Sequence, residues 1–117
     1  MTYVDGFVSA VPTINKEAYR RHAETVAAVF RDHGAVSVVE CWGDDLPEGE
    51  FTSMRLAVRC QDHETVCLSW VTWPDKATRD AALSRVFADP RLRSERNPAP
   101  YDGKCIIRGG FEVLASL

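Results

Sequence analysis

The stretch VCLSWVTWPDKATRDAALSRVF, residues 66–87, decides the fold because it joins a strand to a helix. Val66–Trp73 is rich in β-branched and aromatic residues and gives the strongest strand signal in the chain, and Pro74 closes it. Asp75 predicts the N-cap of a following helix, and Asp89-Pro90 ends that helix because a residue before proline leaves the α region. The apolar residues that recur at helical spacing, and that we expect this helix to bury, are Ala82, Leu83, Val86 and Phe87.

A second strand and helix precede this stretch. Tyr3–Val11 has strand composition and stops at Pro12, and Asn15 is positioned to accept a hydrogen bond from an early backbone N–H of the helix that follows. Gly34 ends that helix at the left-handed position. The residues at helical spacing on its apolar side are Tyr19, Ala23, Val26, Ala27 and Phe30.

Three further strands complete the pattern. Val36–Trp42 carries β-branched residues, and residues 43–49 read as a turn or exposed loop. Apolar and polar residues alternate over Met54–Cys60, which favours a half-buried extra strand over a helix. Cys105–Val113 is the last strand, and Gly109-Gly110 within it indicates a bulge or a close backbone approach.

This order of elements predicts an α+β fold of the ferredoxin-like βαββαβ kind with an extra strand or hairpin. The sheet is antiparallel and both helices lie on one face. The length of 117 residues fits a single domain over residues 1–117.

Composition excludes several classes of protein. Hydrophobic residues make up 45% and charged residues 26%, so the chain is not disordered. A net charge of -3 with scattered basic residues argues against a nucleic-acid binder. The sequence has no membrane-spanning apolar run and no signal-like N-terminus, so we expect a cytoplasmic protein.

The cysteines do not form a recognisable motif. Their spacings match neither a zinc ribbon nor a redox pair, which favours small buried hydrophobes in a reducing compartment. We expect no disulfide framework, no metal site and no cofactor. The four cysteines are Cys41, Cys60, Cys67 and Cys105.

Both faces of the predicted sheet are apolar. In the first strand Tyr3, Phe7 and Val11 alternate with Val4, Val8 and Ala10. Two helices cover only one face, and monomers rarely expose a wide apolar surface. We therefore expect a homodimer in which the second faces pack against each other around a two-fold axis.

Several strings resemble one known family. They are YVDGFVSAVP, GAVSVVECWGDDLPEGE, SWVTWPDKATRDAA, DPR and DGKCIIRGGFEVL, and they run nearly end to end. The chain resembles the YbaA-like family, a domain of unknown function assigned to the dimeric α+β barrel class. The resemblance implies that fold and supplies no activity and no catalytic residues. Tyr101, Cys105 and Ile106 depart from the residues familiar in the family, which leaves the fold expectation intact.

Strand alternation points to three candidate polar residues. Asp5 lies on the same side of its strand as its aromatic neighbours, and Glu40 lies on the same side of its strand as Val38. Arg108 lies in the last strand. These charges are expected to face the region between the sheets. Two interpretations stay open: a structural ion pair or solvated strand end, and a polar anchor in a pocket.

Four further residues are candidates for the same pocket. His22 lies beside the apolar stripe of its helix, where a packed or solvated role is the alternative. Trp42 and Trp70 serve as core packing or as ligand walls. Arg79 lies at the edge of the buried stripe of its helix. It either forms an ion pair with a carboxylate, for which Asp75 and Asp102 are the candidates, or binds an anionic substrate.

The sequence leaves more than one function open. The first is a small-molecule binder or enzyme with a pocket between sheet and helices, including a cofactor-free oxygenase or isomerase by fold analogy. The second is a non-catalytic structural or binding homodimer. An open cavity joining Glu40, Trp42 and His22 favours the first, and a filled core favours the second.

Overall fold

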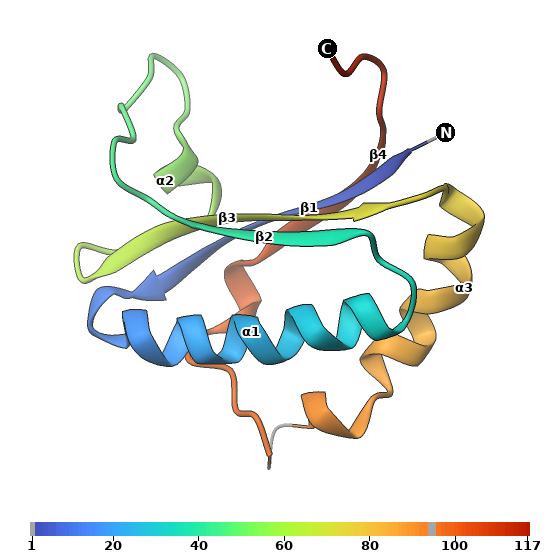
Figure 1. Ribbon diagram of the computed structural model, residues 1–117. Coiled ribbons are helices and arrows are strands. Elements are labelled where there is room, and N and C mark those ends of the chain that lie inside the picture. Colours follow the sequence, from blue (N-terminus) through green and yellow to red (C-terminus); the bar gives the residue numbers. More distant parts are fainter. Residues whose placement is uncertain (1, 94–95) are drawn as a thin grey trace.

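One antiparallel sheet organises the molecule. The computed structural model describes residues 2–93 and 96–117, and its sheet has four strands in the order β2-β3-β1-β4 (Figure 1). The strands are β1 (Tyr3–Pro12), β2 (Ser37–Trp42), β3 (Glu64–Trp73) and β4 (Ile107–Glu112). The last strand of the chain therefore lies beside the first, as in ferredoxin-like folds.

The two long helices connect the strands and lie on the same side of the sheet. The helix α1 (Lys16–Asp32) crosses below the sheet in Figure 1, and α3 (Lys76–Phe87) packs at one end of it. The short helix α2 (Met54–Ala57) lies on the other side. Three 3-10 turns join these elements: η1 (Thr13–Asn15), η2 (Pro90–Leu92) and η3 (Gly103–Cys105). The fold is α+β with βαββαβ connectivity, as the sequence predicts.

The main core lies between the sheet and the helices. Trp73 and Val71 of β3 are buried against Phe30 of α1, and the Phe30 and Trp73 rings are 5.9 Å apart with near edge-on geometry. Such aromatic contacts add to the free energy of burial. Ala82 and Val86 of α3 complete this cluster.

The helix ends agree with the sequence in two places and differ in two others. Asp75 accepts a hydrogen bond from the Thr78 N–H at 2.7 Å, and Gly34 takes a φ of +110° after α1. The prediction that Asn15 caps α1 was wrong, because its amide donates instead to the Pro100 carbonyl at 2.9 Å. The predicted burial of Phe87 was also wrong, since its side chain is 56% exposed.

The extra strand predicted over Met54–Cys60 is a helical turn. The Ser53 hydroxyl accepts a hydrogen bond from the Leu56 N–H at 3.0 Å, which starts α2. Arg59 then adopts a φ of +49°, which ends the turn. The alternating pattern misled because only Val58 is buried in this segment.

The second face of the sheet, on the side away from α1, is called the open face below. Residues 43–62 cover one end of it, where Val58 packs on Ala10 and Val66. The rest exposes large apolar side chains, namely Leu68, Ile107 and Phe111. None of the described helices is long and apolar enough to cross a membrane.

Two glycines in β4 allow close packing. The register between β1 and β4 runs without a bulge, so Gly109-Gly110 marks a close approach. A Cβ on Gly110 would lie 2.4 Å from the Tyr3 hydroxyl oxygen, which leaves no room for a side chain. On the open face, the Phe111 ring lies 3.4 Å from the position of a Cβ on Gly109 and covers this glycine.

Candidate functional site

A cavity of about 610 Å³ lies between the sheet and α1. Its floor comes from β1, β2 and β3, its side wall from α1, and its cover from residues 96–106, called the strap below. The strap is tied to the start of α1 by the bond from Asn15 to Pro100. Cavities of this size are typical of sites for small organic ligands.

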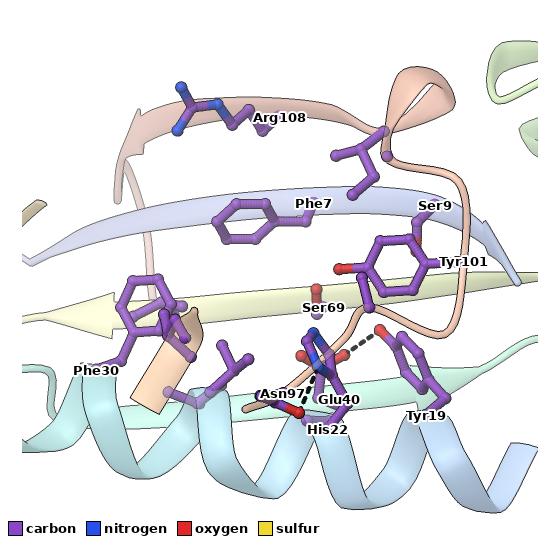
Figure 2. Close-up of a pocket in the computed structure, with 18 of the residues that line it drawn as sticks. Phe7, Ser9, Tyr19, His22, Phe30, Glu40, Ser69, Asn97, Tyr101 and Arg108 are labelled. Carbon is purple, nitrogen blue, oxygen red and sulfur yellow. Dashed lines mark hydrogen bonds between the residues drawn. The ribbon is translucent and has the colours of Figure 1, made fainter. Parts of the chain in front are cut away.

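Glu40 is the carboxyl group in this cavity. Strand alternation turns Glu40 of β2 toward α1, opposite Ser69 of β3 in the sheet register. The Tyr19 hydroxyl donates a hydrogen bond to Glu40 Oε2 at 2.6 Å (Figure 2). Burial raises the pKa of Glu40, and hydrogen bonding from Tyr19 and Ser69 opposes that rise.

Burial and the neighbouring carboxylate raise the pKa of Tyr19. Because the phenol therefore keeps its proton, Tyr19 acts as a donor and Glu40 Oε2 as an acceptor. The pair is half-buried against apolar side chains, where such a bond is stronger than in water.

A second polar group lies one turn further along α1. His22 Nδ1 is 3.1 Å from Asn97 Oδ1 of the strap, and the His22 ring meets the Tyr101 ring edge-on at 5.8 Å. Asn97 Nδ2 is buried with no hydrogen-bond partner among the described residues. Exchanging the amide oxygen and nitrogen would still leave one of these atoms unpaired.

The remaining walls of the cavity are mostly apolar. Phe7, Val26 and Val71 lie on three different elements around it. Arg108 of β4 is exposed at the side of the cavity near Phe87, whose ring centre is 5.5 Å from the guanidinium carbon. The arrangement combines an apolar chamber, an interior carboxyl group and a cation near solvent (Figure 2).

Comparison with known sequences gives the family. The sequence model of the family described as "Protein of unknown function (DUF1428)" matches residues 2–103. The chain belongs to this family. It is 46% identical over 114 residues to "Uncharacterized protein YbaA" of Escherichia coli (strain K12), covering 97% of both chains, and equally similar to the protein of that name from Shigella flexneri. The resemblance seen in the sequence is thereby confirmed.

Solved structures share the fold of this DUF1428 member at low sequence identity. A dimeric ferredoxin-like protein from an uncultured marine organism superimposes with a TM-score of 0.61, at 9% identity, over 99% of this chain and 98% of the other. A mutant of SnoaB, a cofactor-independent oxygenase from Streptomyces nogalater, gives 0.50 at 19% identity, over 99% and 94%. These likenesses establish the ferredoxin-like fold of this DUF1428 chain.

Three of the residues proposed from the sequence line the cavity: His22, Glu40 and Arg108. The side chains of Glu40 and Arg108 lie on the helix side of the sheet. The expectation that they face the region between two sheets therefore differs from their observed position.

Asp5 and Arg79 form a structural pair away from the cavity lining. Arg79 Nη2 lies 2.7 Å from Asp5 Oδ1 and Arg79 Nε lies 3.1 Å from Asp5 Oδ2, while Trp73 Nε1 donates to Asp5 Oδ2 at 2.9 Å. Asp5 is thus the buried partner of Arg79, in place of the predicted Asp75 or Asp102, and the exposed Asp80 carboxylate accepts from Arg79 Nη1 at 2.9 Å. The cluster ties β1, β3 and α3 together in this DUF1428 protein.

The two tryptophans occupy separate places. Trp42 packs on Tyr19 with ring centres 6.1 Å apart and lies under the Lys16 ammonium, where it lines a second cavity of about 360 Å³. Trp70 is paired with Gly6 and Val39 in the sheet and lies on the open face.

Sequence reasoning missed five polar residues of the cavity: Ser9, Tyr19, Ser69, Asn97 and Tyr101. Ser69 did give a signal, since it is a small polar residue in a largely apolar strand. Its position opposite Glu40 becomes visible only when β2 and β3 are paired. The strap residues carry no periodic signal. Among the described residues no group of three or more metal-binding side chains gathers.

Proposed function

We propose that this protein binds a small, largely apolar organic molecule in the cavity between the sheet and α1. The observation that carries the proposal is a largely apolar cavity that is lined by the hydrogen-bonded pair of Glu40 and Tyr19. Few and convergent polar groups in an apolar pocket are the usual means of orienting a ligand. Glu40 is the polar anchor in this account.

The polar side chains of Glu40 and Asn97 argue against a purely structural role for the residues that line the cavity. A half-buried carboxyl group, and a buried amide nitrogen without a partner among the described residues, both cost stability when they serve only packing. Apolar side chains at Glu40 and Asn97 would fill the space at lower cost. Stability is commonly given up in this way at binding sites.

Filling the cavity should abolish binding. Compounds from a panel of aryl carboxylates and cyclic ketones should raise the melting temperature of the natural protein, because a ligand at 100 times its Kd adds about 2.7 kcal/mol. Val26→Phe places a ring in the cavity and should remove the shift for every hit. Differential scanning fluorimetry measures both.

Ala28→Phe is the matched control, since Ala28 is an exposed residue of the same helix. It should keep the shift. If Val26→Phe and Ala28→Phe both respond to the compounds as the natural protein does, the ligands bind elsewhere and the proposal fails.

We also propose that the chain forms a homodimer through its open face. The exposed fractions of Leu68, Ile107 and Phe111 are 38%, 46% and 60%, and these side chains belong to β3 and β4 of one continuous sheet face. Packing a second copy there covers the apolar side chains that the helices leave bare. The marine ferredoxin-like protein of similar fold is described as dimeric, which supports this assembly.

A further inference from the structure

Glu40 lines the cavity, and two hydroxyl groups of the fold position its carboxylate there. The Tyr19 hydroxyl donates to Glu40 Oε2 at 2.6 Å, and hydrogen bonding from the Ser69 hydroxyl also favours the ionised carboxylate. A carboxylate in an apolar chamber, with one oxygen positioned by a tyrosine, is arranged as a general base. The raised pKa of Glu40 makes it a stronger base than an exposed glutamate.

Hydrogen-bond donors stand close to this base. Tyr101 and His22 contact each other ring to ring, and the Tyr19 and Tyr101 ring centres are 5.8 Å apart. Burial and the charge of Glu40 raise the pKa of Tyr101, so its phenol stays protonated and can donate. A base with neighbouring donors can remove a proton next to a carbonyl group while the donors stabilise the oxygen that becomes negative.

The positive charge of Arg108 at the side of the cavity indicates which class of ligand the cavity would bind. Arg108 makes no ion pair within the described residues, and its guanidinium lies over Phe87. Arginine recognises carboxylates by paired hydrogen bonds, and an aromatic neighbour favours an aromatic group. An acid with an apolar or aromatic body matches the cation near the exit and the apolar chamber behind it.

The second cavity also borders Glu40. Tyr19, Ala23, Val38 and Glu40 line both cavities, and Lys16 and Arg20 line only the second one, on the outer side of α1. Glu40 thus borders both the ligand chamber and the second cavity. Lys16 and Arg20 are exposed at the edge of the second cavity, so Glu40 can return a proton to solvent on that side.

We infer, resting on the proposed function, that the cavity interconverts the keto and enol forms of small 2-oxo acids with an aromatic or apolar side group, with Glu40 as the base. Glu40 takes a proton from the carbon beside the carbonyl, so a C–H bond breaks and an O–H bond forms on the carboxyl. The C–H electron pair becomes the C=C bond, and the carbonyl π electrons move to oxygen. The oxygen gains a proton from water and Glu40 returns its proton to water, so nothing is oxidised or reduced.

Phenylpyruvate is the probe for this reaction. In D2O the natural protein should speed the exchange of the benzylic hydrogens for deuterium, followed by proton NMR, and should speed ketonisation of the enol, followed by its ultraviolet absorbance. Glu40→Gln should lower both rates by about 10²-fold to 10⁴-fold, the usual contribution of a general base. Glu48→Gln makes the same chemical change in an exposed loop and should leave both rates unchanged.

The pH profile and thermal shifts separate the outcomes. The natural protein should lose rate on acidification with a midpoint at higher pH than that of an exposed glutamate, because Glu40 must be ionised to act and burial raises its pKa. If phenylpyruvate raises the melting temperature in a Val26-dependent way without accelerating exchange, the tautomerisation fails and the binding proposal stands. If Glu40→Gln retains the full rate, Glu40 is not the base and the inference is overturned.

Discussion

Arg79→Leu should destabilise the protein by about 3–5 kcal/mol, the usual cost of leaving a buried charge without its partner. The Asp5 side chain is only 5% exposed, and Arg79 supplies its charge partner. Domains of this size are stable by about 5–15 kcal/mol, so the variant should lose a large share of its stability. Urea unfolding followed by circular dichroism measures the loss.

Two further variants separate loss of the ion pair from loss of packing. Arg85→Leu changes an exposed arginine of the same helix, whose Nε donates to the Ala81 carbonyl, and should cost much less. Adding Asp5→Asn to Arg79→Leu removes the stranded charge and keeps an acceptor for the Trp73 indole, so stability should partly return. Equal losses of stability for Arg79→Leu and Arg85→Leu would show that the ion pair of Asp5 and Arg79 contributes nothing to stability.

Leu68→Asp should convert a dimer into a monomer. Leu68 lies in a central strand on the open face, and a two-fold interface would bury the new carboxylate of each copy without a partner. Light scattering coupled to size exclusion should give twice 13.1 kDa for the natural protein and 13.1 kDa for the variant at micromolar concentration.

Ala28→Asp provides the comparison for this experiment, because it adds the same charge on the exposed side of α1. It should remain dimeric. A natural protein that is monomeric at this concentration, or a Leu68→Asp protein that stays dimeric, would rule out the open face as the interface.

Much of the fold is predictable because its signals are local. The composition of β3, the Pro74 stop and the Asp75 cap define a strand and helix without knowledge of any other segment. The same reasoning failed at α2, where a Ser53 cap and a single buried residue override an alternating pattern. A four-residue helix leaves too short a periodic signal to compete with a strand of equal length.

The site is less predictable because its parts meet only in three dimensions. Glu40 and His22 stand out as polar residues beside apolar stripes, and both line the cavity. Asp5 stands out equally, yet the pairing of β1 with β3 and the path of α3 place it against Arg79 instead. Tyr101 enters the cavity through a strap whose course depends on tertiary contacts such as the bond from Asn15 to Pro100.

Locating a bound ligand tests the central claim most directly. A crystal structure should be determined with the panel compound that gives the largest rise in melting temperature. We expect density in the chamber between α1 and the sheet, in contact with Glu40 and Tyr101. Density confined to the open face, beside Trp70 and Phe111, or a chamber closed by its own side chains, would contradict it.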